Sequence, residues 1–245
     1  MSVNIDTVYQ RVLGILNKEQ RGYVTPQEFN LFANQAQMDL FEQYFYDINQ
    51  FGRIPGNSTA FSDMLTILNE KIALFQKRAD LTYDVTNNIF PLPTDLYRLG
   101  TIIYQNSTTD PFNSSTPITE DIEAERINAN ELLYINSSPL TKPVNTRPIY
   151  TQNELGIRVF GAAEITDAVS CSFIKKPTKV EWKYQIVYGE ALYDASQSIN
   201  FELHPSEETE LVIKILEMAG LLVKDIQMYQ IAAGEEVRNT QEEKA

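Results

Sequence analysis

The chain has 245 residues, 43% of them hydrophobic, and its formal net charge at pH 7 is −13. This length and apolar fraction allow a sizeable core in one or two domains and exclude a wholly disordered chain. The acidic balance disfavours a protein that binds nucleic acid or an anionic membrane, because both need a field of Lys and Arg.

The sequence also disfavours secreted and membrane-spanning proteins. The single cysteine, Cys171, cannot form a disulfide within the chain. No run of about 18 apolar residues predicts a transmembrane helix. The first residues, MSVNIDTVYQ, lack the basic and apolar regions of a signal peptide. We therefore expect a soluble, acidic protein that is made inside a cell.

The N-terminal part of the chain is predicted to be helical. Apolar residues recur with a spacing of three and four, which is typical of amphipathic helices. A strong start signal lies in VTPQEF, where Thr25 is the N-cap, Pro26 is the first helical residue and Glu28 completes a capping box. The pattern predicts helices over residues 5–16, 26–48 (with its apolar stripe over 29–48) and 61–75.

The pattern changes to a period of two from about residue 81, which predicts a β-rich middle. Turn residues separate the alternating runs, as expected for hairpins. We expect hairpins over 81–93 (turning at Asn87 and Asn88) and 149–161, and strands over 99–105 and 167–177. Residues 106–117 are predicted to form a polar loop, and 120–135 a short helix.

Helical patterning returns over 183–198 and again in FELHPSEETELVIKILEMAGLLVKD. In the latter, Pro205 suits the first helical position, which makes His204 the N-cap, while Ser206 is the alternative N-cap. The glutamates that follow lie in the first turns, where the helix dipole favours negative charge.

The order of these elements predicts an α+β fold. We expect a helical bundle formed by the N- and C-terminal helices, with an inserted β-rich middle lobe and an extended C-terminal tail. The predicted parts are N-terminal helices over 1–80, a β-rich insertion over 81–180, C-terminal helices over 181–233 and a polar tail over 234–245.

The residues that could carry chemistry are few. His204 is the only histidine, and one histidine with one cysteine cannot supply the three or four ligands of a zinc site. Cys171 lies on the apolar face of a predicted strand, where a thiol is inert. No glycine-rich phosphate loop occurs. We therefore expect no catalytic residue, no cofactor and no metal.

Two charged clusters leave alternatives open. The acidic run comprises Glu120, Asp121, Glu123 and Glu125. A carboxylate pair within it would suit glycoside hydrolysis, although such a run is usually a solvated face. Lys175, Lys176 and Lys179 lie beside Trp182. We interpret this small patch as a salt-bridge or partner contact and not as a nucleic-acid site.

Four segments together point to a family. They are VYQRVLGILNKEQRGYVTPQEFNLFANQAQ, LPTDLYRLGTI, SPLTKPVNTRPIYT and NFELHPSEETELVIKILEMAGLLVKD. They resemble the neck proteins of tailed bacteriophages, specifically the ring (head-to-tail connector) proteins of crAss-like phages. The resemblance covers nearly the whole chain, and its motifs are architectural and not enzymatic.

The resemblance implies a non-enzymatic virion protein, made in the host bacterial cytoplasm, that forms a homo-oligomeric ring of twelve copies. It would join the portal protein above to a second ring or tail protein below and line the channel through which DNA passes without specific binding. Adaptors of this kind dock a C-terminal extension on the portal, and the polar tail from Gly234 is the natural candidate here. The candidate portal contacts are Met228, Tyr229, Ile231, Val237 and Arg238.

Two other functions compete with the ring adaptor. One is a virion-associated cell-wall hydrolase that uses the acidic run between Glu120 and Glu125. The other is a host-side regulatory binding protein. Abundant Tyr and Phe in helical stripes fit either a buried core or subunit contacts, because these residues are also enriched in buried interfaces, and the wide stripe over 29–48 favours some of each.

Overall fold

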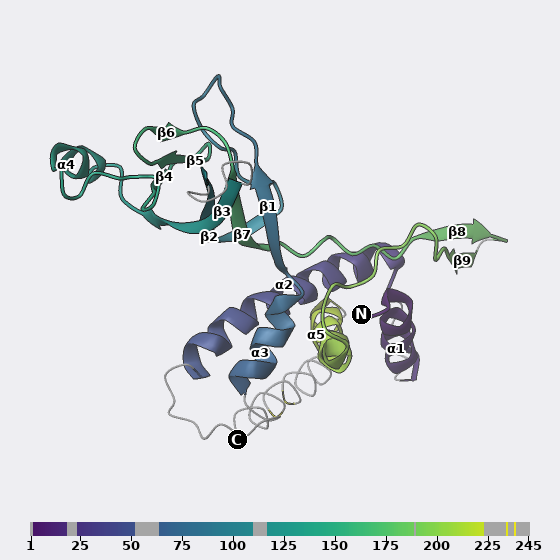
Figure 1. Cartoon of the computed structure of the whole chain (residues 1–245). Coiled ribbons are helices and arrows are strands. Elements are labelled where there is room, and N and C mark those ends of the chain that lie inside the picture. Colours follow the sequence, from purple (N-terminus) through teal and green to yellow (C-terminus); the bar gives the residue numbers. More distant parts are fainter. Residues whose placement is uncertain are drawn as a thin grey trace. The chain divides into compact units, whose positions relative to one another are not determined.

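The computed structural model describes residues 2–18, 24–51, 64–109, 117–188 and 190–222, together with Gly234 and Arg238. These residues form helices and strands in a mixed α+β structure, which confirms the predicted class (Figure 1). The chain divides into two compact units. The terminal unit combines Met1–Leu74 with Pro177–Ala245, and the central unit is Phe75–Lys176. None of the described helices is long and apolar enough to cross a membrane.

Four helices build the described part of the terminal unit. Helix α2 contacts α3 and α5, and α5 also contacts α1. Their positions confirm the helices predicted from apolar spacing, except that the third ends before Phe75, which is buried beyond the helix, and that its predicted first residues, 61–63, lie outside the described residues. The bounds are α1 (Ile5–Lys18), α2 (Pro26–Phe51), α3 (Met64–Ala73) and α5 (Glu208–Leu222).

The core of this unit draws on both halves of its sequence. The backbone N–H of Phe201 donates to the carbonyl of Val3 over 3.1 Å, and the N–H of Ile5 donates to Asn200 Oδ1 over 3.0 Å. The N-terminal segment is thereby held against the residues that precede α5. The fully buried side chains include Ile5, Tyr9, Leu16, Phe29, Leu40, Phe41, Phe201, Leu203, Leu211 and Ile215.

Helix α2 begins with the predicted capping box. The backbone N–H of Thr25 donates to Glu28 Oε2 over 2.9 Å, and the N–H of Glu28 donates to Thr25 Oγ1 over 3.3 Å. The Thr25 hydroxyl also donates to the same carboxylate over 2.8 Å. The backbone N–H and the hydroxyl of Thr25 lower the pKa of Glu28. Val24 and Phe29, at the positions of a hydrophobic staple, are both buried.

Thr25→Ala is expected to lower the free energy of unfolding of the terminal unit by about 1 kcal/mol, because the N–H of Glu28 loses its acceptor. The measurement is urea unfolding followed by the fluorescence of Trp182, the only tryptophan, which is buried in this unit. Thr25→Ser is the control, since a serine keeps the cap. Equal unfolding midpoints for the alanine variant and the wild type would contradict the capping role.

The C-terminal helix also begins as predicted. His204 is the N-cap of a short 3₁₀ turn, η1 (Pro205–Glu207), which leads directly into α5. Its Nδ1 accepts from the backbone N–H of Ser206 over 3.3 Å. Of the two candidates for the N-cap, the structure therefore selects His204. The Ser206 hydroxyl lies 2.9 Å from His204 Nδ1 and donates to Glu207 Oε1 over 3.0 Å.

A seven-stranded sheet forms the central unit, in the order β1-β7-β2-β3-β4-β5-β6. All neighbouring strands are antiparallel except β3 and β4. The bounds are β1 (Gln76–Leu81), β2 (Leu96–Thr109), β3 (Pro117–Arg126), β4 (Ile149–Gln152), β5 (Ile157–Phe160), β6 (Glu164–Ile165) and β7 (Val169–Lys175).

The sheet curls around an apolar core (Figure 1). Val169, Cys171 and Phe173 are buried together, which confirms the alternation predicted for this strand. A register shift in β2 between Leu99 and Ile102 brings Gly100 close to β7. A Cβ at Gly100 would lie 2.8 Å from the Ser172 carbonyl oxygen, so the close approach of the two strands requires glycine.

The helix predicted over 120–135 is wrong for most of its length. Residues up to Arg126 belong to β3, and only α4 (Leu132–Ser137) is helical. Ala124 pairs with Ile102 and is buried in the core, whereas Asp121 and Glu123 are exposed. Glu and Ala favour a helix locally, but the backbone pairing with β2 outweighs that preference.

The helix predicted over 183–198 is also wrong, so the C-terminal part over 181–233 is not purely helical. Residues here form a two-stranded hairpin, β8 (Tyr184–Val187) and β9 (Glu190–Tyr193). Tyr184, Ile186 and Val187 prefer strands, and Tyr188 adopts a positive φ of 54° that begins the turn. The spacing of the apolar residues here fits both the helical period of 3.6 and the strand period of 2, and the turn at Tyr188 favours the strands.

Smaller corrections concern the ends of elements. The predicted hairpin over 81–93 is reduced to a turn with one isolated bridge, Asp84 to Ile89, because β1 pairs with β7 instead. Of the predicted loop over 106–117, the residues up to Thr109 belong to β2 and Pro117 begins β3, while 110–116 lie outside the described residues. The hairpin over 149–161 is confirmed as β4 and β5. In the tail predicted to be extended, Gly234 and Arg238 are helical.

Candidate interaction surface

Three amide side chains of α2 hold a strand-like segment of the terminal unit. Asn30 donates from Nδ2 to the Trp182 carbonyl over 3.2 Å and accepts from the Trp182 N–H over 2.8 Å. Asn34 does the same with Val180, over 2.8 Å and 3.0 Å. Gln37 donates to the Thr178 carbonyl over 2.8 Å. We call Asn30, Asn34 and Gln37 the amide ladder.

The amide ladder can pair with an extended segment because the axial spacing of helix residues four apart nearly equals the spacing of strand residues two apart. Residues four apart on a helix are about 6 Å apart along its axis, and residues two apart on a strand are about 6.6 Å apart. Asn30 and Asn34 therefore meet the backbone of alternate residues, Trp182 and Val180, as a neighbouring strand would, and Gln37, three positions on, reaches Thr178 with its longer side chain. Glu181, between two of these residues, pairs with Ile199 on the other side through hydrogen bonds of 3.2 Å and 2.9 Å.

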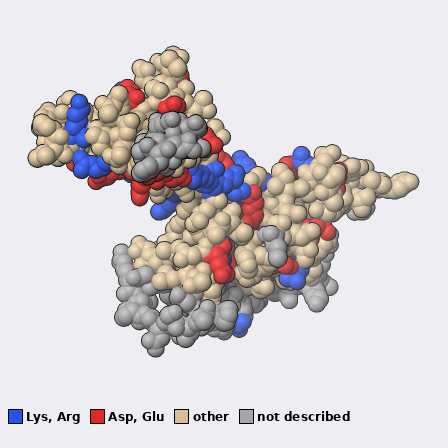
Figure 2. All heavy atoms as spheres, viewed as in Figure 1, with Lys and Arg blue, Asp and Glu red and all other residues tan. Residues whose placement is uncertain are grey.

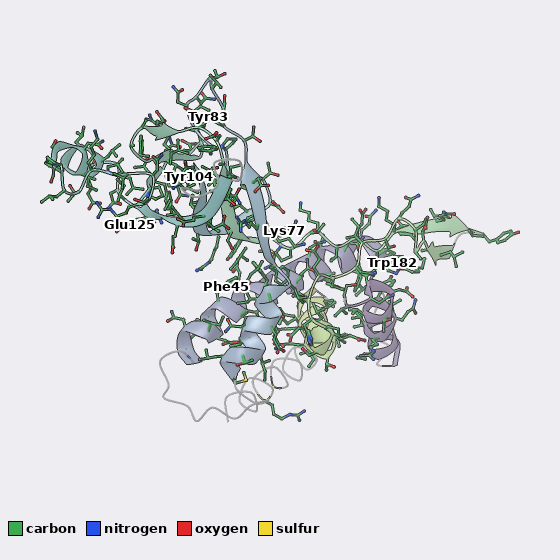
Figure 3. The ribbon with its side chains drawn as sticks, viewed as in Figure 1. Phe45, Lys77, Tyr83, Tyr104, Glu125 and Trp182 are labelled. Atoms are coloured by element: carbon green, nitrogen blue, oxygen red, sulfur yellow. The ribbon has the colours of Figure 1, made fainter. Side chains whose placement is uncertain are left out.

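Trp182 connects this segment to the hairpin. Its Nε1 donates to Asp6 over 2.9 Å, and its ring centroid lies 4.6 Å from that of Tyr9. Tyr184 and Tyr193, the first residue of β8 and the last of β9, both stack on the indole with centroids 5.7 Å apart. Figure 3 shows Trp182 at the base of the hairpin, where it meets the helices. The hairpin therefore has a rigid aromatic base.

Beyond that base the hairpin extends away from the helices of its unit (Figure 1). Ile186 is 74% exposed, Leu192 61% and Tyr188 103%. Figure 2 shows its surface almost free of charged side chains. We call residues 184–193 the arm. Exposed apolar surface of this kind makes the arm a candidate site of contact with another molecule.

A second exposed apolar segment lies in the central unit. It contains α4 and the turn that follows, where Leu133, Tyr134 and Leu140 are 75%, 79% and 89% exposed. Helix α4 has no buried residue. Lys142 and Arg147 flank the segment, and Arg147 donates to the Leu140 carbonyl over 3.2 Å. We call residues 132–141 the knob.

The acidic run predicted as a possible carboxylate site is partly gathered in a groove of the central unit. Glu123, Glu125, Arg126, Arg147 and Tyr150 line it, and its volume is about 410 Å³. Asp121 instead pairs with Arg78 over 3.1 Å. Burial raises the pKa of the Tyr150 phenol, Arg126 opposes this effect and Glu123 reinforces it.

The glutamates around His204 have a role that the sequence did not reveal. Glu207 is buried, and its Oε1 lies 2.7 Å from Lys71 Nζ of α3. Glu208 pairs with Arg11 of α1 over 2.9 Å. Among the described residues, no group of three or more His, Cys, Asp or Glu side chains is placed to hold a metal ion. The acidic cluster thus connects α5 to neighbouring helices.

The structure also places the other residues that the sequence analysis singled out, namely Cys171, Trp182 and the predicted portal contacts. Cys171 is buried, and burial raises the pKa of its thiol. Trp182 is 3% exposed, so its ring is not available beside the lysine patch. Of the predicted portal contacts, Arg238 is helical and exposed, whereas Met228, Tyr229, Ile231 and Val237 lie outside the described residues.

Sequence reasoning missed both the amide ladder and the arm. The ladder has a weak signal, namely amides at positions 30, 34 and 37 beside the buried Ala33, Ala36 and Leu40 of the same helix.

Comparison with known proteins adds no family to these observations. No protein-family model matches the chain, and no curated protein matches it with significant sequence similarity.

Proposed function

We propose that this chain is a structural, non-enzymatic ring-forming adaptor of a phage neck, which joins the portal to the tail and lines the DNA channel. The proposal includes the finer architecture, a bundle of terminal helices with an inserted β-rich lobe. Its partners are further copies of the chain, a portal protein on one side, and a second ring or tail protein on the other. The four segments that resemble crAss-like ring proteins support this proposal.

The arm is the observation that carries the proposal. It presents Ile186, Tyr188 and Leu192 to solvent from a base that Trp182 fixes to the helices. A protein that works alone gains nothing from such a surface, because exposed apolar area favours aggregation. An assembly subunit gains a contact. The net charge of −13 also suits a channel wall, because negative charge repels the phosphates of passing DNA.

Quantitative proteomics of purified phage particles tests the adaptor role. We expect the chain at a fixed ratio to the portal protein, in the copy number of a neck ring. Native mass spectrometry of the purified chain with that portal should show a complex, even if the chain alone is monomeric. A chain that is absent from particles, or that does not bind the portal, would end the proposal.

An activity assay on the purified chain distinguishes the adaptor from the hydrolase alternative. A hydrolase would use the groove carboxylates Glu123 and Glu125. Turnover of cell-wall glycans by the wild type that is lost in Glu125→Gln would favour the hydrolase. We expect no turnover by either protein.

A further inference from the structure

Exposed apolar side chains are unevenly distributed along the chain. Of the fifteen large hydrophobic residues that are exposed in the described parts, nine fall in two short stretches. The remaining six occur singly, as on any protein surface. The two stretches contain the knob and the arm: Leu133, Tyr134, Leu140 and Val144, and Ile186, Val187, Tyr188, Leu192 and Ile199.

The arm is an element that its own chain supports weakly. An isolated two-stranded hairpin is at best marginally stable in water. Beyond the aromatic base, β8 and β9 pair only with each other among the residues that the structure describes. At the turn, Tyr188 holds a φ of 54°, which costs a bulky residue about 1 kcal/mol or more, and its side chain remains fully exposed. Strain that places an aromatic ring in solvent favours a role in contact with a partner.

The knob has the same property. Helix α4 spans six residues, none of them buried. Helices this short are not stable in water without packing. The helix is held by local contacts, such as the Ser137 hydroxyl that donates to the Leu133 carbonyl over 2.7 Å. Leu133 and Tyr134 are therefore presented outward by a helix whose other apolar residues, Leu132 and Ile135, are only partly buried.

Charge selects a second copy of the chain as the occupant. Two copies that each carry −13 repel each other, and a contact through uncharged surfaces places the least like charge at close range. The knob contains no charged residue, and the arm contains only Glu190. In a chain that is 22% charged, these two segments are thus suited to contact between copies.

We propose that the arm of one copy docks on the knob of the next copy. A closed ring needs such a head-to-tail contact, because each subunit must present two different and complementary surfaces. Tyr188, Ile186 and Leu192 of the arm pack against Leu133, Tyr134 and Leu140 of the knob. This inference rests on the proposed ring and names the surfaces that form it.

Cysteine cross-linking tests the contact. The only native cysteine, Cys171, is fully buried in the central unit and does not compete for a thiol reagent. The variant Tyr188→Cys/Tyr134→Cys, treated with a short bismaleimide, should give a ladder of covalent oligomers on a denaturing gel. Tyr188→Cys/Val85→Cys is the control, since Val85 is 78% exposed in the same unit but lies outside the knob.

Chains with only one introduced cysteine show which two surfaces meet. A mixture of Tyr188→Cys chains with Tyr134→Cys chains should give dimers and nothing larger. Dimers from Tyr188→Cys alone would mean that two arms meet each other, and this would overturn the proposal. A ladder no stronger than that of the Val85 control would overturn it as well.

A further substitution separates docking from folding. Tyr188→Asn places Asn before Gly189, and this pair is preferred in two-residue hairpin turns with positive φ. The terminal unit should unfold at an unchanged or higher urea concentration. Cross-linking between cysteines introduced at Leu192 and Tyr134 should fall about tenfold or more, as for a lost aromatic anchor. Unchanged cross-linking would contradict a contact through Tyr188.

These outcomes are independent of the adaptor experiment. A chain found at a fixed ratio in particles whose arm does not cross-link to the knob remains an adaptor with a different contact. A chain that cross-links in this way but is absent from particles self-associates for another purpose. The two proposals therefore fail separately.

Discussion

Asn34→Ala is expected to lower the free energy of unfolding of the terminal unit by roughly 2–3 kcal/mol. Asn34 satisfies both the N–H and the carbonyl of Val180, and Val180 is 2% exposed, so water cannot easily replace the lost amide. Each buried group left without a partner costs about 1–3 kcal/mol, and the better helix propensity of alanine offsets part of the sum. The measurement is urea unfolding followed by Trp182 fluorescence.

Two variants control for this effect. Gln35→Ala removes an exposed amide from the same helix, whose bond of 2.7 Å is to Asp39, and should change stability by less than about 0.5 kcal/mol. Asn34→Asp keeps the acceptor for the Val180 N–H but loses the donor to its carbonyl, so we expect an intermediate cost. If Asn34→Ala were as stable as Gln35→Ala, the ladder would not hold the 178–182 segment.

Lys71→Met is expected to destabilise the terminal unit by about 3 kcal/mol. The side chain of Glu207 is 3% exposed and lies 2.7 Å from the Lys71 ammonium, whose side chain is 13% exposed. Removal of the lysine leaves a buried carboxylate that still accepts a hydrogen bond from the Ser206 hydroxyl over 3.0 Å. The loss of the Lys71 contact with the Tyr44 ring, 5.5 Å away, adds to the cost.

A double-mutant cycle isolates the ion pair. The variant Lys71→Met/Glu207→Leu should recover most of the stability, because apolar residues of similar size often replace a buried ion pair without loss. Arg11→Met is the matched control. Its pair with Glu208 also joins a helix to α5, but Arg11 is 53% exposed, so its loss should cost no more than about 1 kcal/mol. If Lys71→Met and Lys71→Met/Glu207→Leu lowered the free energy of unfolding equally, the buried Glu207 carboxylate would not depend on Lys71.

Local signals account for what was predictable at the candidate site. The caps at Thr25 and His204 were predictable because each involves residues within three positions of one another. The burial of Cys171 followed from alternation along a single strand. The sequence of the arm predicts a helix as readily as a strand, because Tyr, Ile, Ala and Leu at short spacing satisfy both the helical and the strand period. The exposure that makes the arm a candidate surface is not encoded in apolar spacing.

By itself, the sequence determined the mixed α+β class, the start of α2 and of the C-terminal helix, and the strand around Cys171, because short-range sterics and hydrogen bonds decide these features. The tertiary structure alone decided three others. Asn34 meets Val180 across 146 positions, Glu207 meets Lys71 on another helix, and the run up to Arg126 becomes a strand by pairing with β2. In each case, the energy comes from a partner distant in the chain, and no local pattern of residues specifies where that partner will lie.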